Sequence, residues 1–551
     1  MKGSIEDRGL MIRELYGTWK KQTIWGFFQD TVKRYPENEF LVTGYEETYT
    51  YRRSEEIICH IAAKLSAIGV REGTHVAVQA SNTSEAIFLA LAIAALHAVK
   101  VSVHVSLGIK ELNYVLTQSK AQFFITCREF CLEDKFEHLK GIVALDGGNC
   151  EVSSVPVYSW SEFISLESGF VLPAGMEETK ADCMSDIIYT SGSTSAPKGV
   201  ILTHDMLMRS ALASCINRGF ELGRRVFIPL PMFHVYGYVE GLLTSILAGG
   251  TVLIRKGKFE AEPVVAFMKE QRANDILSVP SQMIHLIEYL NENPCDFPDL
   301  HAVYCSASLC PGWLWSAIRE KLGVQDLITG YGMSEVCGAT MQTDPFDNDE
   351  ILRTRVGKLL PGGSAGSPEY DGHQLEYKVM DQNTLEECKP GENGELWCRG
   401  LVVTSGYFER PEINASAFTE DGWFRTGDCG HFDENGYLIL AGRLDEVYKI
   451  NGENVSPKFI ENIMGNCPEV KEVAVLGIPD NKHGHVGVAY FELYKDCEEN
   501  RKKTENYCKE HLAKFQIPKY MIYLTEDLWP RTSTGKIQKF RLKEMAAGFI
   551  D

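Results

Sequence analysis

The sequence predicts an α/β fold with a large N-terminal domain, whose β-sheets are flanked by helices, and a small C-terminal α+β domain. Its 551 residues exceed what one hydrophobic core usually supports, so two or more domains are expected. The 44% hydrophobic content is sufficient for packed cores. Short β-rich runs alternate with helical patterns, which indicates largely parallel sheets. The clearest runs cover residues 75–80, 122–126, 226–230, 251–254, 276–279 and 327–329.

The pattern changes close to Arg443. Beyond it, we expect strands at residues 473–478 and 486–493 and a helix at 501–513. A remainder of about a hundred residues is a natural size for a small domain. We therefore expect two domains, residues 1–444 and residues 445–551.

No segment predicts export or a membrane span. Residues 1–21 mix charges and lack the apolar core of a signal peptide. The longest apolar run, residues 86–96, stops at His97, far short of the ~20 residues that cross a bilayer, and it predicts a buried helix. The C-terminal Gly-Phe-Ile-Asp differs from a peroxisomal Ser-Lys-Leu signal. We expect a cytoplasmic protein.

Charge and cysteine content narrow the function further. The net charge of −20 argues against nonspecific nucleic-acid binding and against docking on anionic membranes. An anionic ligand would therefore need a local basic site. The 16 cysteines form no C-x-x-C pair, so we expect reduced thiols rather than a zinc ribbon or a thioredoxin-type site.

A loop rich in glycine and hydroxyl residues is the strongest local signal. Residues 186–189 and 200–202, on either side of it, are β-rich, so the loop is expected to join two strands. Glycine lets backbone amides approach an anion, and hydroxyls and a lysine add donors and charge. The residues concerned are Thr190, Ser191, Gly192, Ser193, Thr194, Lys198 and Gly199. Composition alone also allows a solvated turn. No Gly-Lys-Ser/Thr follows, which excludes a P-loop NTPase.

Further clusters belong with this loop. A predicted strand leads into Gly330, Tyr331, Gly332, Met333, Ser334 and Glu335, which offer an aromatic face, a hydroxyl and a carboxylate for a base, a phosphate and a magnesium ion. Asp428 follows a tight turn and can accept hydrogen bonds from paired hydroxyls such as those of a ribose. Arg443, the segment from Lys449 to Gly452, and a loop at residues 530–537 that presents Lys536 complete the set.

In this order, the clusters closely resemble the adenylate-forming superfamily of acyl-CoA synthetases, adenylation domains and luciferases, and the chain is most similar to acyl-CoA ligases. The resemblance covers residues 24–543. It implies that the first domain binds ATP and the acyl group, while the second is mobile and carries the adenylation lysine. The implied reaction activates a carboxylic acid to its acyl-adenylate, releases pyrophosphate, and transfers the acyl group to the thiol of coenzyme A. ATP, Mg²⁺ and coenzyme A are the implied cofactors.

The resemblance also implies roles for individual residues. The loop from Thr190 to Lys198 would hold the β- and γ-phosphates, and Tyr331, between Gly330 and Gly332, would stack on adenine. Ser334 would contact the α-phosphate, and Glu335 with Thr190 would bind magnesium. Asp428 and Arg443 would bind the ribose, with Lys449 and Gly452 also at the nucleotide. Lys536 would bridge the carboxylate and the α-phosphate, because attack between two anions needs positive charge. Asp445 would be the hinge between two half-reactions.

The acyl pocket implied by the resemblance is mostly apolar or aromatic, which favours a fatty or aryl acid. Its residues are Phe233, His234, Val235, Tyr236, Tyr238, Val279, Met283, Met333 and Val336. Amino-acid-activating domains have an aspartate where this chain has His234, so an α-amino acid would lack a partner for its cation. The segments that would form this pocket, residues 233–241, 279–285, 304–309 and 330–339, contain no arginine, which weakens the case for a dicarboxylate. His234 either gates the pocket or packs there, and Glu240 faces either water or a cationic group of the substrate.

Several positions depart from the usual pattern of this superfamily. Ser195 stands where glycine is more common, Ser334 replaces a threonine, and Ser306, Ala307 and Ser308 alter a glycine-rich adenine wall. Residues 363–374 resemble an insertion and are expected to form an exposed loop. Two other functions stay open: a stand-alone ligase that loads a carrier protein, and a non-catalytic relative that binds nucleotide. Luciferase-type oxidation is a minor third. Retention of the residues implied for catalysis argues against the non-catalytic relative.

Overall fold

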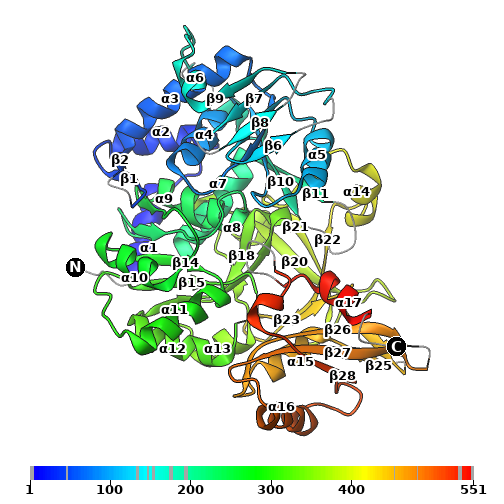
Figure 1. Ribbon diagram of the computed structural model, residues 1–551. Helices are drawn as coiled ribbons and strands as arrows, with labels where there is room; N and C mark the ends of the chain where they lie inside the picture. Colours follow the sequence, from blue (N-terminus) through cyan, green and yellow to red (C-terminus); the bar gives the residue numbers. More distant parts are fainter. Residues whose placement is uncertain are drawn as a thin grey trace.

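The structure is a computed structural model that describes residues 5–44, 47–131, 136–145, 148–151, 155–172, 178–190, 197–308, 310–451, 453–480, 482–531 and 537–547. Two seven-stranded sheets, one three-stranded and one four-stranded sheet form the part before Arg443, and a further sheet forms the C-terminal part. In Figure 1 the C-terminal segment, in orange and red, lies below the rest of the chain. The predicted α/β class, with a small α+β unit at the C-terminus, is confirmed.

The first seven-stranded sheet is parallel except at one edge, where β1 and β2 run antiparallel. Its central strands are buried along their length, as expected for strands that are covered on both faces. In spatial order the strands are β16 (Asp326–Ile328), β15 (Ala302–Cys305), β14 (Asp275–Ser278), β12 (Arg225–Phe227), β13 (Thr251–Leu253), β1 (Glu39–Val42) and β2 (Thr48–Thr50). Four of these strands match the runs expected from the sequence to within a few residues.

The second seven-stranded sheet is also parallel, except that β11 returns antiparallel to β10. Its order is β11 (Lys198–Thr203), β10 (Met184–Thr190), β4 (Val99–Ser102), β3 (His75–Gln79), β5 (Phe123–Thr126), β7 (Gly141–Ala144) and β9 (Val157–Ser159). A short parallel pair, β6 (Glu129–Cys131) and β8 (Asn149–Glu151), lies beside it. The β10–β11 pair confirms that the glycine- and hydroxyl-rich loop joins two strands.

Helices pack around these two sheets and between them. The N-terminal ones are α1 (Ile5–Leu15), α2 (Ile24–Arg34), α3 (Tyr51–Ile68), α4 (Ser84–Ala95), α5 (Ile109–Gln118), α6 (Trp160–Ser165) and α7 (His204–Asn217). Those that follow are α8 (Val235–Gly237), a π-helical turn (Tyr238–Leu243), α9 (Thr244–Leu247), α10 (Ala261–Glu270), α11 (Pro280–Glu292), α12 (Gly312–Leu322) and α13 (Asp349–Thr354). The apolar run expected as a buried helix is α4, which Thr83 caps by accepting a hydrogen bond from the Ala86 amide.

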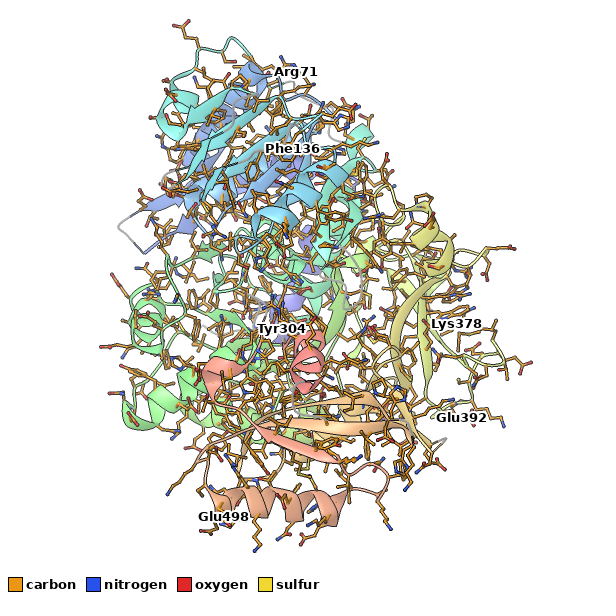
Figure 2. The ribbon with its side chains drawn as sticks, turned by 45° about the vertical axis from the view of Figure 1, so that its right-hand side comes forward. Arg71, Phe136, Tyr304, Lys378, Glu392 and Glu498 are labelled. Carbon is orange, nitrogen blue, oxygen red and sulfur yellow. The ribbon has the colours of Figure 1, made fainter. Side chains whose placement is uncertain are left out.

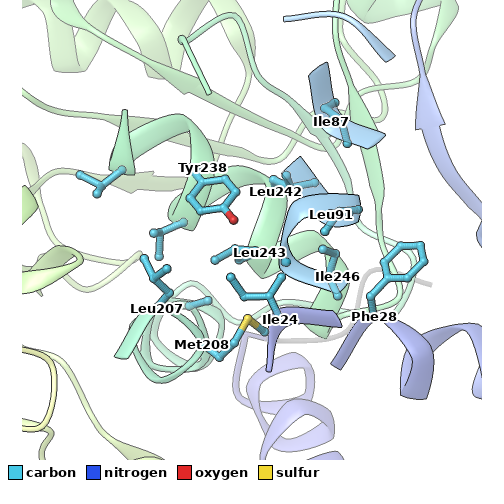
Figure 3. Close-up of a cluster of buried hydrophobic side chains, with 14 of the residues drawn as sticks. Ile24, Phe28, Ile87, Leu91, Leu207, Met208, Tyr238, Leu242, Leu243 and Ile246 are labelled. Carbon is cyan, nitrogen blue, oxygen red and sulfur yellow. The ribbon is translucent and has the colours of Figure 1, made fainter. Parts of the chain in front are cut away.

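The largest core lies where α7, α9 and the π-helical turn meet α2 and α4. Figure 3 shows Leu207 from α7 beside Leu243 of the π-helical turn, with Leu91 of α4 next to Ile246 of α9. All four side chains are almost completely buried. This packing fixes α8 and the π-helical turn between the two large sheets.

Smaller antiparallel sheets complete the N-terminal part. Strands β17 (Gly330–Met333), β18 (Gly338–Gln342) and β19 (Lys358–Leu359) form one. Strands β20 (Leu375–Met380), β21 (Gly394–Gly400), β22 (Phe424–Phe432) and β23 (Leu438–Arg443) form the other, with helix α14 (Pro411–Ala417) between β21 and β22. The segment 363–374 differs from the expected exposed loop. Ala365 is fully buried and its carbonyl accepts from Arg209 of α7, so only part of the segment faces solvent.

The C-terminal part has its own sheet and cores. Its strands are β25 (Glu453–Val455), β24 (Tyr448–Ile450), β27 (Gly484–Leu493) and β26 (Val470–Asp480), with β28 (Tyr520–Tyr523) parallel to β27. Its helices are α15 (Pro457–Met464), α16 (Glu498–His511) and α17 (Lys539–Ala547). Both expected strands and the expected helix are present, each a few residues longer or shifted. The two core clusters of this part contain no residue before Tyr448.

Candidate active site

The two strands on either side of the glycine- and hydroxyl-rich loop are paired up to the loop itself. Thr190 lies opposite Lys198, and Tyr189 lies opposite Gly199. A Cβ added to Gly199 would lie 2.6 Å from Cγ2 of Ile187, so glycine is needed here for space and not for an unusual backbone angle. Ser191, Gly192, Ser193 and Thr194 lie outside the described residues, and their assigned roles stay predictions.

A second group of expected residues is joined by direct side-chain contacts. The hydroxyl of Tyr331 donates to Oδ2 of Asp428 at 2.8 Å, and Arg443 donates to Oδ1 of the same carboxylate at 3.2 Å. Asp428 and Arg443 are opposite one another in the β22–β23 ladder. Burial raises the pKa of Tyr331, and the adjacent Asp428 raises it further, so its hydroxyl stays a donor. The structure therefore brings together three residues that are far apart in the sequence.

Glu335 belongs to a third set of contacts, centred on a residue that the sequence analysis missed. Tyr407 donates to Oε1 of Glu335 at 2.8 Å, and Nζ of Lys198 lies 5.2 Å from the centroid of the Tyr407 ring. The backbone of Tyr407 also forms an antiparallel β-bridge with Val200 of β11. Burial raises the pKa of Glu335, and the hydrogen bond from Tyr407 opposes that rise. No local pattern marks Tyr407, because its partners come from two distant segments.

A cavity of about 700 Å³ lies between the N-terminal part and the C-terminal part. Its N-terminal wall contains residues expected at the nucleotide: Ser306, Ala307, Ser308, Gly330, Tyr331, Gly332, Asp428 and Arg443. The side chain of Ser306 donates to the carbonyl of Gly330 at 2.8 Å, which ties the expected adenine wall to β17. Ala307 adopts a left-handed backbone with φ of 76°, a conformation that favours glycine.

The C-terminal wall of this cavity is strongly charged. Its cations and carboxylates are Lys458, Lys471, Arg531, Lys539, Glu446, Glu461, Glu472, Glu492 and Glu526. Several are paired, for example Lys539 with Glu446 and Glu461. Burial opposes the charge on Lys539, yet these two carboxylates raise its pKa. In Figure 1, α15 of this part lies next to β23 of the N-terminal part.

Lys536 and Gly452 lie outside the described residues, so their roles stay predictions. The residues on either side of the lysine loop, Arg531 and Ile537, both line the cavity and pair with each other. Asp445 is exposed and accepts from Nε of Arg443 at 3.1 Å, whereas Lys449 is exposed on β24.

The residues expected in the acyl pocket lie on different sides of α8. Tyr236 points to the first large sheet, because its hydroxyl donates to the carbonyls of Ser278 and Tyr304 at 3.0 and 2.8 Å. Tyr304 lies near the centre of the molecule in Figure 2. Tyr238 points to the second sheet, where its ring centroid lies 3.8 Å from Nζ of Lys100. Phe233 and Tyr238 line a separate cavity of about 40 Å³.

The remaining acyl-pocket residues are placed as follows. Met333 lines the large cavity. Val235, Val279, Met283 and Val336 are buried in hydrophobic cores and do not line that cavity. Nδ1 of His234 accepts from the Tyr236 amide at 3.3 Å, so His234 caps α8. The roles expected for these residues in acyl binding stay predictions.

Among the residues that the structure describes, no helix is both long and apolar enough to cross a membrane. Within the same part of the chain, no group of three or more His, Cys, Asp or Glu side chains is arranged as a metal cluster.

Comparisons with known proteins agree with this geometry. The chain matches the family model described as AMP-binding enzyme over residues 28–408, and that of the AMP-binding enzyme C-terminal domain over residues 460–536. It is 30% identical to the oxalate–CoA ligase of Arabidopsis thaliana, covering 94% of this chain and 97% of that protein. It is 25% identical to the mitochondrial medium-chain acyl-CoA ligase ACSF2 of Macaca fascicularis, over 95% and 87% of the two chains.

Two solved structures of one enzyme also resemble this chain over almost its whole length. The o-succinylbenzoate CoA synthetase MenE of Bacillus subtilis, in complex with its acyl-adenylate intermediate, has a TM-score of 0.78 and 27% identity, covering 95% of this chain and 98% of that one. The complex of the same enzyme with ATP and a magnesium ion has a TM-score of 0.77 and 26% identity, over 95% and 99% of the two chains. The chain belongs to the AMP-binding enzyme family, and it is an AMP-forming acid–thiol ligase.

Proposed function

We propose that the cavity of about 700 Å³ binds Mg-ATP and the carboxylate of an apolar acid, and that the protein converts this acid to its acyl-adenylate and then to a coenzyme A thioester. The observation that carries this proposal is the hydrogen-bonded set of Tyr331, Asp428 and Arg443 at the wall of the cavity. Three polar side chains from three strands are held by one another in a fixed arrangement. Such preorganised groups bind a ligand without a reorganisation cost.

In this proposal Asp428 accepts hydrogen bonds from the two ribose hydroxyls. Tyr331 and Arg443 already donate to its two oxygens, which fixes the orientation of the carboxylate. Each carboxylate oxygen can accept more than one hydrogen bond, so both retain capacity for a ribose hydroxyl. The Tyr331 ring is almost completely buried, so only an edge or part of one face would be available to adenine.

The residues near Glu335 fit a magnesium ion. Glu335 provides a hard oxygen ligand whose charge is disfavoured by burial, and a bound cation would offset that penalty. Magnesium commonly uses one or two carboxylates together with substrate phosphates and water, so it needs no cluster of protein ligands. Thr190, at the start of the phosphate loop, would supply a hydroxyl. When bound, the ion would neutralise phosphate charge.

The chain's own residues would do the rest of the chemistry. Lys198 would balance charge on the β- and γ-phosphates. Lys536 would lie between the carboxylate and the α-phosphate, and this role is supported by the position of Arg531 and Ile537 in the cavity wall. Positive charge placed between two anions stabilises the developing charge as the acid attacks phosphorus. Pyrophosphate leaves as the bond between the carboxylate oxygen and the α-phosphorus forms. The thiol of coenzyme A then attacks the acyl carbon and gives up its proton, and AMP leaves as the thioester forms.

The residues that the resemblance assigns to the acyl pocket, among them Tyr236, Tyr238 and Met333, are mostly aromatic or apolar, which supports a fatty or aryl acid. Glu240 is not free to pair with an α-amino group, since both of its oxygens already accept hydrogen bonds. Coenzyme A is the proposed acceptor.

Exchange of labelled pyrophosphate into ATP, measured with a panel of acids, tests the first step. We expect exchange with at least one medium-chain or aryl acid and none with amino acids. Adding coenzyme A, or a phosphopantetheinylated carrier protein in its place, then identifies the acceptor by the thioester that forms. Absence of exchange with every acid would refute the proposed function.

A further inference from the structure

One buried acid in the described residues takes no part in the reaction outlined above. Glu240 lies in the π-helical turn Tyr238–Leu243 and is 1% exposed. Resting on the proposed function, we propose that Glu240 is a positioning residue: its carboxylate holds strand β18, and thereby fixes the β17–β18 hairpin that places Ser334 and Glu335 against the phosphates and the magnesium ion.

The carboxylate of Glu240 is surrounded by donors from two segments, β18 and the C-terminal end of α7 with its cap residue Arg218. Oε1 accepts from the backbone amide of Ala339 on β18 at 3.2 Å. Oε2 accepts from the side chains of Gln342 at 3.2 Å and of Ser214. The guanidinium of Arg218 lies 3.8 Å from Oε2. A carboxylate that accepts this many bonds in a buried site is held in one position.

The π-helical turn itself is stabilised by side chains that donate hydrogen bonds to its backbone carbonyls. The carbonyl of Glu240 accepts from Nη1 of Arg218 at 2.7 Å and from the hydroxyl of Thr244 at 2.8 Å. Arg218 is anchored in turn by Asp275 of β14 at 2.7 Å. Single π-helical turns are uncommon and occur often at functional sites. Here the turn is tied to the first large sheet, so Glu240 connects that sheet to β18.

Strand β18 transmits this restraint to the expected catalytic residues. Ala339 lies opposite Gly332, and Gly338 lies opposite Met333, the residue before Ser334. The strands are so close here that a Cβ added to Gly332 would lie 1.8 Å from the Gly338 carbonyl oxygen. A shift of β18 must therefore move β17 as well. Small displacements at a catalytic site can lower activity strongly.

Glu240 does not act as a ligand for the substrate. Its two oxygens accept three hydrogen bonds and lie beside Arg218, so no charge is left for a cation of the acid. The sequence left open whether Glu240 faces water or a cationic group, and its burial excludes bulk water. The role that remains for Glu240 is structural: it positions the β17–β18 hairpin.

Two substitutions separate the effect of the length of the Glu240 side chain from the effect of its charge. Glu240→Gln keeps the length of the side chain and an oxygen that accepts from Ala339 but loses the charge, whereas Glu240→Asp keeps the charge and is one methylene too short. We define the magnesium advantage as the ratio of the dissociation constants of ATP without and with Mg²⁺, both measured by calorimetry on the full chain. We expect Glu240→Gln to retain this ratio within about twofold, and Glu240→Asp to lower it by about tenfold.

Leu91→Ala is the matched control. It removes a buried side chain of α4 from the hydrophobic core that also contains residues of the π-helical turn, but away from the hairpin. It should lower the melting temperature while leaving the magnesium advantage unchanged. The inference is overturned if Glu240→Asp keeps the wild-type ratio, if Glu240→Gln loses as much as Glu240→Asp, or if Leu91→Ala loses the ratio too. Wild-type protein that fails to bind Mg-ATP would instead overturn the proposed function itself.

Discussion

Removal of one hydroxyl tests the proposed magnesium site most directly. In Tyr407→Phe, Glu335 loses the hydrogen bond that Tyr407 donates at 2.8 Å while the ring is retained. A hydrogen bond to a charged group contributes about 1.5–3 kcal/mol. The lower end of that range corresponds to about a tenfold loss, so the Mg²⁺ concentration for half-maximal pyrophosphate exchange should rise by about tenfold.

The pH dependence of this variant follows from the same contact. Burial raises the pKa of Glu335, and the bond from Tyr407 lowers it, so the variant has a still higher pKa. Magnesium needs the ionised carboxylate, which forms as the pH rises through that pKa. The defect should therefore be larger at about pH 6 than at about pH 8.

Tyr437→Phe is the control for Tyr407→Phe. Its hydroxyl donates to Asp347 at 2.7 Å, and neither residue lines the large cavity. It should leave the Mg²⁺ requirement unchanged at both pH values. Equal Mg²⁺ requirements in Tyr407→Phe and wild type at both pH values would refute the reasoning.

Three other substitutions give separate tests. Lys536→Ala should abolish pyrophosphate exchange but leave thiolysis of a supplied acyl-adenylate largely intact, because the lysine is needed between two anions only in the first step; equal loss in both steps would contradict that role. Asp445→Pro should restrict the hinge and slow thioester synthesis while exchange continues, and unaffected synthesis would argue against a hinge there. Ala307→Gly should relieve the left-handed backbone and raise the free energy of unfolding in urea by up to about 1 kcal/mol. The same change at Ala317 in α12 should lower it by about 1 kcal/mol, and a loss at both positions would rule out strain at Ala307.

The sequence predicted those parts of the site whose signals are local. Strand patterns predicted that the loop containing Thr190 and Lys198 joins two strands, and in the structure these two residues are paired at the ends of β10 and β11. The turn before Asp428 and the position of Arg443 also come from short segments, although their pairing across β22 and β23 required the structure. These features could be predicted because β-branched runs, glycines and turn residues act over a few positions.

Contacts between distant segments could not be predicted in this way. Tyr407 reaches Glu335 across 72 positions, and no periodic pattern marks it. Tyr236 and Tyr238 are only two residues apart, yet a short helix followed by a π-helical turn directs them to different sheets. The segment 363–374 has the composition of a loop, but packing against α7 buries part of it. Tertiary packing decides such cases, and one sequence does not record it.

Arg443 donates hydrogen bonds to two carboxylates, and these two contacts link the expected ribose site to the expected hinge. It donates to Asp428 on one side and to Asp445, the expected pivot, on the other. Rotation about Asp445 would disturb the second bond and so change how firmly the guanidinium steadies the first. Ribose occupancy and lobe orientation would then influence each other by the same free energy in both directions. If the C-terminal part rotates about Asp445 as proposed, this arginine at the last position of β23 would couple the release of AMP to that rotation.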